Sequence, residues 1–87
     1  MIGLASWFHP EPDNWYRGLH VCASNTVTIG HRVRVTNLYN HRRSWCVIIG
    51  RGPFYGNRVL DVSPAVRDDL HMLHDGVVRV RIVDVIK

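Results

Sequence analysis

The sequence predicts a small all-β barrel with one helical insert. Short apolar or alternating stretches, about six in number, are separated by glycine- and proline-containing turns, as expected of an all-β fold. One Ser-Pro pair, Ser63-Pro64, opens a stretch that is typical of a helix. The 87 residues suffice for a single domain, residues 1–87. A core this small is marginal, which favours a closed sheet without exposed edges.

The first part of the chain is interpreted as two short strands joined by a loop. The strands are the apolar segments Gly3–Phe8 and Leu19–Ala23, and His9–Gly18 between them carries two prolines. Trp15 and Tyr16 in this loop either cover the core or form an exposed aromatic contact.

The middle of the chain predicts a hairpin. After a turn region at Asn25–Gly30, the segment His31–Leu38 alternates valine with polar residues, which indicates a half-buried strand. Tyr39–Arg43 is a polar hairpin turn. Ser44–Ile49 is an unbroken apolar run, which is typical of a strand buried on both faces or one in a closed barrel. Trp45 within it is expected in the core.

The last part adds a strand, the helix and a final strand. Gly50–Pro53 ends the preceding strand, and Asn57–Val62 is the next one. The helix is expected to run from Ser63-Pro64 to near Gly76. Val77–Ile86 alternates, but the phase of its apolar residues flips, which predicts a bulge or a strand that crosses the barrel rim.

Composition and charge limit the function classes. A hydrophobic share of 46% and a charged share of 21% exclude a disordered chain. The formal net charge of +4 favours anionic partners: nucleic acid, anionic wall polymers or an acidic protein. Four arginines alternate with core valines, which indicates the solvated side of a sheet, with a basic patch as the alternative: Arg32, Arg34, Arg79 and Arg81.

The two cysteines and the start of the chain bear on the compartment. Cys22 and Cys46 do not have zinc-type spacing; they either pair in an oxidising compartment or remain buried thiols. Thiols are favoured, because nothing directs the chain to secretion. The first residues do not form a signal peptide, and no stretch is long enough to span a membrane. We therefore expect an excised domain or a protein used without the ordinary secretion route.

Several motifs in fixed order resemble one family. The runs GHRVRVTNLYN, RGPF and GNRVLDVSPAV, and the opening GLASWF, are similar to the double-psi β-barrel of rare lipoprotein A (RlpA) proteins. The resemblance implies two interlocked ψ-loops in a six-stranded barrel with one short helix. It also implies relatives that act on polysaccharide: bacterial lytic transglycosylases and, more distantly, expansins and barwin-like domains. Because fold does not fix function, the site is compared residue by residue.

Most of the functional positions that the resemblance implies are changed. The family's acidic residue before R-G-P-F falls on Gly50, and its histidine falls on Ser24. An acidic loop of the family has no counterpart, because the segment from Trp7 to Leu19 is too short. Asp61 matches the retained aspartate of the family's I-D-L-S motif. It is either a catalytic acid or, the favoured interpretation, a residue that caps the helix or bonds nearby amides.

The remaining candidates are contacts to glycan. Aromatic and basic residues in loops are the expected glycan contacts: Trp15, Tyr16, Arg51, Phe54 and Tyr55. Glu11 and Asp13 are alternative acids for the expected glycan-binding groove, but the simpler interpretation is that they are solvated loop residues.

No cofactor is expected, and the signal for a metal is weak. His71 and His74 are spaced three apart on the expected helix, near Asp68 and Asp75, but no third ligand is defined. A solvated helix face is the favoured interpretation, so we expect no metal site.

Three functions follow, in order of preference. The first is a non-catalytic module that binds peptidoglycan or a related polysaccharide, or packs against protein subunits, for instance in a phage tail. The second is a divergent lytic transglycosylase that uses Asp61. The third and least favoured is nucleic-acid binding through the basic strand faces.

Overall fold

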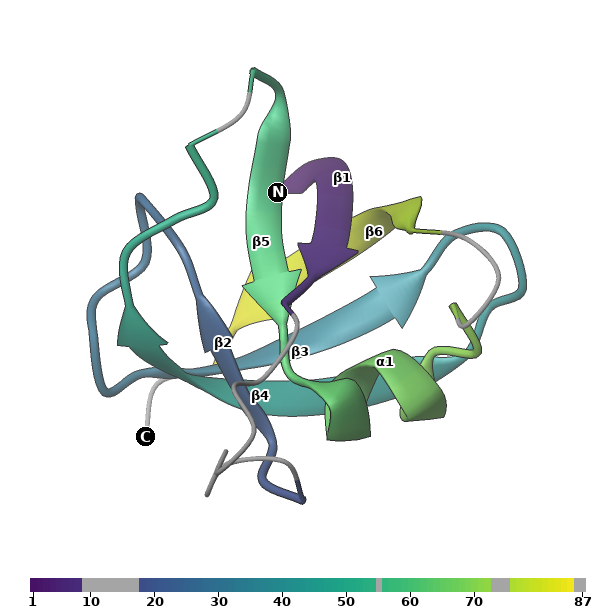
Figure 1. Cartoon of the computed structure of the whole chain (residues 1–87), viewed down its shortest axis with the longest axis horizontal. Helices are drawn as coiled ribbons and strands as arrows, with labels where there is room; N and C mark the ends of the chain where they lie inside the picture. Colours follow the sequence, from purple (N-terminus) through teal and green to yellow (C-terminus); the bar gives the residue numbers. More distant parts are fainter. Residues whose placement is uncertain (9–17, 55, 73–75, 86–87) are drawn as a thin grey trace.

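The computed structural model describes residues 1–8, 18–54, 56–72 and 76–85, and within them six strands close into a barrel with one helix (Figure 1). The elements are β1 (Ile2–Trp7), β2 (Val21–Ala23), β3 (Arg32–Asn37), β4 (Arg43–Gly50), β5 (Arg58–Val62), α1 (Pro64–Asp69) and β6 (Val77–Asp84). The predicted closed barrel with one short helix is confirmed. Among the described helices, none is long and apolar enough to cross a membrane.

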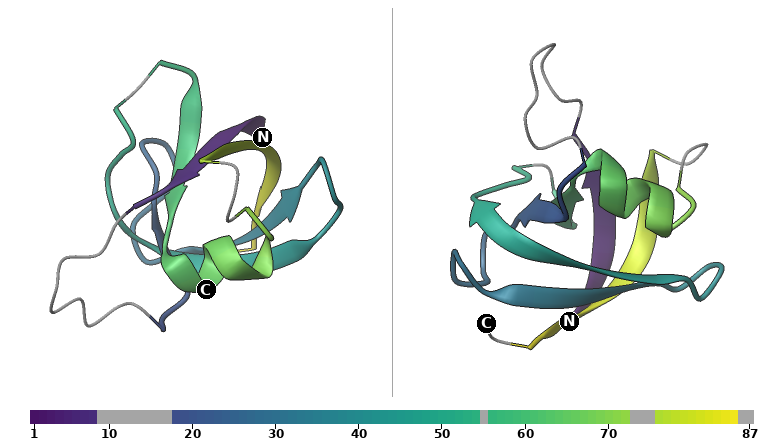
Figure 2. Two further views of the ribbon diagram at one scale, coloured as in Figure 1. Left: turned by 45° about the vertical axis from the view of Figure 1, so that its right-hand side comes forward. Right: turned by 90° about the horizontal axis from the view of Figure 1, so that it is seen from below.

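The strand order around the barrel is β1-β5-β2-β4-β3-β6 (Figure 2). β1 pairs in parallel with β5, and β2 pairs in parallel with β4. The other four pairs are antiparallel. Because parallel neighbours cannot be joined by a tight turn, each parallel pair brings together segments that are far apart in sequence.

The core consists of the inward residues of every strand. Alternation places Val33 and Val35 of β3 and Leu60 and Val62 of β5 inside, each without solvent exposure. The remaining core side chains come from the other strands, the turn between β2 and β3, the helix and the segment after it: Ala5, Cys22, Val27, Cys46, Ile48, Val66, Leu70, Met72, Val78, Val80 and Ile82.

The helix is shorter than the sequence predicts. It begins at Pro64 as expected, but it ends at Asp69 and does not continue to near Gly76. Leu70 closes it with its amide bonded to carbonyls of the last turn, and His71 adopts a left-handed φ of 52°. This change of direction turns the chain so that Leu70 and Met72 both enter the core.

Of the two interpretations of this apolar run, strand β4 confirms a strand in a closed barrel and not burial on both faces. Its residues alternate between buried and exposed, so Trp45 is 43% exposed and lies outside the core. The neighbours Ser44 and Cys46 are the buried ones. A strand in a single closed barrel has only one inward face, so an unbroken apolar run still leaves half its side chains outside.

Strand β6 does not contain the predicted bulge. Its pairing with β1 and β3 keeps a regular register, up to Asp84 opposite Val33. Val78, Val80 and Ile82 point inward, whereas Val83 lies on the outer face and is 43% exposed. The apparent phase flip therefore arises because an apolar residue, Val83, lies on the exposed face of a regular strand.

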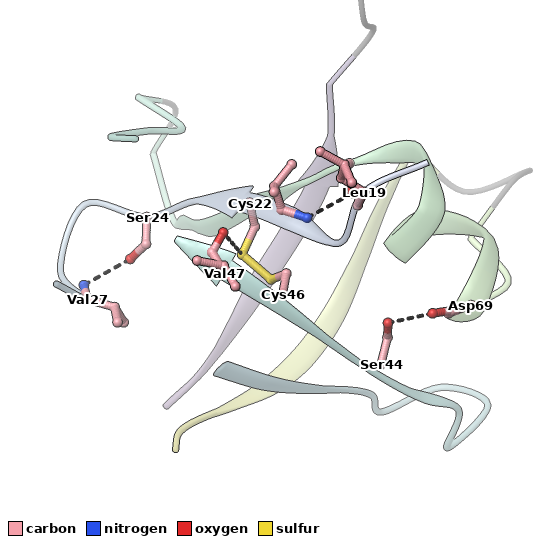
Figure 3. Close-up of a disulfide and its surroundings, with 10 residues drawn as sticks. Leu19, Cys22, Ser24, Val27, Ser44, Cys46, Val47 and Asp69 are labelled. Atoms are coloured by element: carbon pink, nitrogen blue, oxygen red, sulfur yellow. Dashed lines mark hydrogen bonds between the residues drawn. A yellow bond between two sulfur atoms is a disulfide. The ribbon is translucent and has the colours of Figure 1, made fainter. Parts of the chain in front are cut away.

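The cysteines form a disulfide that joins β2 to β4 (Figure 3). Cys22 and Cys46 are both fully buried, and their Cα atoms lie 5.8 Å apart. The favoured interpretation as free thiols was wrong. The parallel pairing of β2 with β4 brings the two inward residues together, and this long-range contact is not visible in the local sequence.

We predict that this disulfide contributes a large share of the stability of so small a barrel. It closes a loop with a sequence separation of 24 residues. For a loop of that size, the lost chain entropy of the unfolded state corresponds to about 3 to 4 kcal/mol. This contribution is measured by urea denaturation of three proteins: the oxidised protein, the reduced protein and the double variant Cys22→Ala/Cys46→Ala. Equal midpoints for all three would contradict the prediction.

Candidate functional site

A line of mainly small or polar residues crosses one side of the barrel, which we call the transverse row. Val77 of β6 pairs with Ser6 of β1, and Ser6 pairs with Asp61 of β5. Asp61 in turn pairs with Ala23 of β2, which pairs with Gly50 of β4. Four strand spacings make the row about 19 Å long. The row therefore brings together Asp61 and Gly50, two of the positions that the resemblance singles out.

Asp61 lies on the outer face of β5. Its strand neighbours Leu60 and Val62 are buried in the core, and Asp61 is half-buried. The Ser6 hydroxyl donates a hydrogen bond of 3.1 Å to Oδ1 of Asp61. This bond ties β5 to β1, which supports a structural role, and it leaves the carboxyl group partly accessible on the outer face.

Gly50, at the end of β4, stands where the resemblance places an acid. A Cβ atom added at Gly50 would meet no heavy atom within 4 Å, and its φ is not in the left-handed region. Neither packing nor backbone conformation requires glycine there. The position is open, but it carries no group that transfers a proton.

Ser24, at the position of the family's histidine, is used by its own loop. It follows β2 directly, and its amide donates to the Gly50 carbonyl at 3.1 Å. Its side chain is buried, and its Oγ accepts hydrogen bonds from the amides of Thr26 at 3.1 Å and Val27 at 3.0 Å (Figure 3 shows the bond to Val27). Ser24 therefore stabilises a turn and presents no proton-transfer group to the transverse row.

Arg51 holds the same turn from the other side. One guanidinium nitrogen, Nη1, donates to the carbonyls of Ser24 at 3.1 Å and Val27 at 2.6 Å. Nearby, the Asn25 side chain donates to the Pro53 carbonyl at 2.6 Å. These contacts lock the turn after β2 to the loop after β4. A contact between Arg51 and glycan stays a prediction.

Phe54 is an exposed aromatic beside the row. Its side chain is 80% exposed. At Gly52, where φ is +133°, an added Cβ would lie 3.7 Å from the Phe54 ring and 4.0 Å from Cβ of Ala23. The ring therefore lies near the Gly50 end of the row. The other residues proposed for the groove lie outside the described residues: Glu11, Asp13, Trp15, Tyr16 and Tyr55.

A second cluster surrounds Trp45 and was missed by sequence reasoning. The His20 ring stacks on Trp45 with centroids 4.8 Å apart, and the Arg32 guanidinium lies 4.8 Å from the ring centroid. His20 Nε2 lies 2.8 Å from Oδ2 of Asp69, at the end of α1. The apolar run Ser44–Ile49 gives no alternation in the sequence, and only the burial of Cys46 in the barrel shows that Trp45 lies outside.

Asp69 links this cluster to the helix. Burial disfavours its charged form, but hydrogen bonds from Ser44 and His20 outweigh that effect and lower the pKa of Asp69. The Ser44 hydroxyl donates to Oδ2 at 2.7 Å. The ionised carboxylate therefore joins the end of α1 to β4 and to the segment before β2.

The histidine pair does not form the expected helix face. The helix has ended before His71, which is exposed, and His74 and Asp75 lie outside the described residues. Within the described ranges, no group of three or more His, Cys, Asp or Glu side chains is placed to hold a metal ion.

Comparison with known proteins decides the family. No profile of a protein family matches the chain. The chain is 33% identical over 91 residues to endolytic peptidoglycan transglycosylase RlpA of Helicobacter pylori, with 93% of the chain covered. It is also 33% identical over 92 residues to RlpA of Neisseria meningitidis serogroup A, with 97% covered. The chain is an RlpA-like double-psi β-barrel.

Solved structures agree on the fold of this RlpA-like barrel. Cerato-platanin 3 from M. perniciosa superposes with a TM-score of 0.72 at 14% identity, covering 98% of this chain and 94% of that one. Streptomyces papain inhibitor superposes with a TM-score of 0.68 at 19% identity, covering 95% of this chain and 93% of the inhibitor chain. The chain spans only 28% of the H. pylori relative and 38% of the N. meningitidis relative.

The lowered pKa of Asp69 predicts how stability depends on acid. A folded-state pKa below the unfolded value adds stability that is fully present above the unfolded pKa and lost as the pH falls through the folded one. Below about pH 4, the unfolding free energy of the wild type is expected to decrease more steeply with falling pH than that of Asp69→Asn. Denaturation curves between pH 7 and 2.5 measure this, and parallel pH profiles would contradict it.

Proposed function

We propose that this RlpA-like barrel is a non-catalytic module that binds peptidoglycan glycan along the transverse row. The observation that carries the proposal is the composition of that row. The row retains the hydrogen-bonded carboxyl group of Asp61 but has glycine, Gly50, at the other acidic position. Next to the row, the histidine position holds Ser24, which is committed to a turn. The family relatives named as peptidoglycan transglycosylases support the glycan as partner.

The remaining acid is suited to binding. Glycosidic cleavage needs a proton donor at the leaving oxygen. The Asp61 carboxyl group accepts a hydrogen bond from the Ser6 hydroxyl. Carboxyl oxygens also accept hydrogen bonds from sugar hydroxyls, and the exposed Phe54 ring near the Gly50 end of the row offers an apolar face to a sugar ring.

The disulfide supports a place outside the reducing cytosol. Disulfides persist in oxidising compartments such as the periplasm and the cell surface, where peptidoglycan lies. Packing against protein subunits, including a place in a phage tail or virion, stays a prediction from the sequence. Mass spectrometry of purified phage particles checks this prediction by detecting the protein among the particle's components.

A transglycosylase that relies on Asp61 is the second candidate. The partly accessible position of Asp61 in the row favours it, because a single acid/base suffices for that reaction when the sugar's own hydroxyl is the nucleophile. Under this alternative, wild-type protein releases anhydro-muropeptides from sacculi and Asp61→Asn does not.

We predict binding without product when purified protein is incubated with sacculi. The wild type is expected in the pellet, with no anhydro-muropeptides in the supernatant. Phe54→Ala is expected to weaken binding about tenfold, since one aromatic contact is worth roughly 1 to 3 kcal/mol. Ile29→Ala removes an exposed apolar side chain from the turn before β3, outside the transverse row, and serves as the control.

The outcomes separate the candidate functions. Products from the wild type that disappear with Asp61→Asn would establish the enzyme and refute the non-catalytic module. No sedimentation of the wild type would refute glycan binding and favour protein neighbours. Equal binding by Phe54→Ala and Ile29→Ala would place the contact away from the transverse row.

A further inference from the structure

A hollow opens beside the Val77 end of the transverse row, which we call the Tyr39 hollow. It has a volume of about 430 Å³ and is lined by Tyr39, Val77, Val78 and Arg79. A volume of this size falls within the usual range of sites for small molecules. Val77 is both the first residue of β6 and the last member of the row. The hollow therefore continues the row across β6, toward the turn between β3 and β4.

Tyr39 supplies an open aromatic face to this hollow. Its side chain is 83% exposed and lies in the turn that joins β3 to β4. Phe54, which is 80% exposed, lies near the Gly50 end of the row. Within the described parts of the chain, these two are the most exposed large hydrophobic side chains. An exposed aromatic ring therefore stands at each end of the row.

The turn that carries Tyr39 is fixed by hydrogen bonds. The Asn37 side chain is buried; its Oδ1 accepts from the Tyr39 amide at 2.9 Å, and its Nδ2 donates to the Leu70 carbonyl at 2.9 Å. The Leu38 amide donates to the Arg79 carbonyl at 2.9 Å, which ties the turn to β6. A side chain on a backbone held in this way loses less conformational freedom when a ligand binds, which favours affinity.

The residues around the hollow suit a sugar ring. One face of such a ring carries C–H groups, which pack on an aromatic ring, and its rim carries hydroxyl groups. Tyr39 offers the aromatic ring, and Val77 adds an apolar side chain. Arg79 is exposed on the same outer face of β6 as Val77, and its guanidinium is a donor for sugar hydroxyls. Among the described residues, no ion pair includes Arg79.

We propose that the Tyr39 hollow is a further sugar-binding position for the glycan strand that lies along the transverse row. The proposal rests on the proposed function and extends its site beyond β6. Val77 pairs with Ser6, and Ser6 pairs with Asp61, so two strand spacings, about 10 Å, separate Val77 from Asp61. A glycan bound at Asp61 therefore reaches the hollow within a few linked sugar rings.

The first test follows single amides by nuclear magnetic resonance of nitrogen-labelled protein while soluble, peptide-free glycan oligosaccharides are added. We expect the amide signals of Tyr39 and Arg79 to shift over the same oligosaccharide concentrations as that of Asp61. The reason is that one strand occupies the row and the hollow together. The signal of Ile29, in the turn before β3, is expected to stay in place.

The second test compares variants in the same titration. Tyr39→Ala is expected to bind the oligosaccharides about tenfold more weakly than the wild type, because it removes one aromatic contact. Tyr39→Phe keeps the ring and is expected to stay within about twofold of the wild type. Ile29→Ala removes an exposed apolar side chain outside both the row and the hollow, and is expected to match the wild type. Melting curves verify that each variant is folded.

The outcomes separate this proposal from the proposed function. A shift at Asp61 without shifts at Tyr39 and Arg79, or equal affinities of Tyr39→Ala and Ile29→Ala, overturns the further sugar position and leaves glycan binding by the row intact. Shifts at Tyr39 and Arg79 without one at Asp61 overturn the continuous site. If no signal shifts with any oligosaccharide, the proposed function fails as well. If Tyr39 and Arg79 shift only with a single-stranded oligonucleotide, the hollow binds nucleic acid and the sugar position is refuted.

Discussion

The parallel pairing of β2 with β4 is the contact on which the rest of this barrel depends. It joins segments that no short turn connects, and the buried Cys22–Cys46 bond fixes it covalently. The same pairing sets Ala23 beside Gly50 and lets the Ser24 amide reach the Gly50 carbonyl. The positions where relatives of this fold are expected to carry catalytic groups are therefore held together here, although the groups themselves are absent.

Two surfaces of different chemistry follow from the alternation of the strands. On the outer faces of β1, β5 and β2, the transverse row contributes small or polar side chains and the carboxyl group of Asp61, and the exposed Ile2 also lies on β1. On β3, β4 and β6, five exposed arginines gather: Arg32, Arg34, Arg43, Arg79 and Arg81. Closure of the sheet thus turns a linear sequence pattern into a basic side and a side that holds the Asp61 carboxyl group.

Alternating valines and turn residues made the strands and the closed fold predictable, because these signals act over a few residues. The disulfide, the exposed Trp45 and the end of α1 were not predictable in the same way. Each depends on a long-range contact: the β2–β4 pairing, the single inward face of β4, and the fit of Leu70 and Met72 into the core. At the site, the motifs singled out Asp61 and Gly50, which strand pairing brings into one row, but they could not show that Ser24 faces its own loop.

Under the proposed non-catalytic function, the two changed positions differ in how readily they accept a larger side chain. At Gly50 the surrounding space is empty, so a carboxylate side chain can be introduced without disturbing a neighbour. At Ser24, a larger ring would displace a buried hydroxyl that satisfies two amides and would disturb the loop that Arg51 contacts. Substitution is therefore sterically open at Gly50 and obstructed at Ser24. A side chain on which the fold itself depends is harder to exchange than a glycine with open space around it.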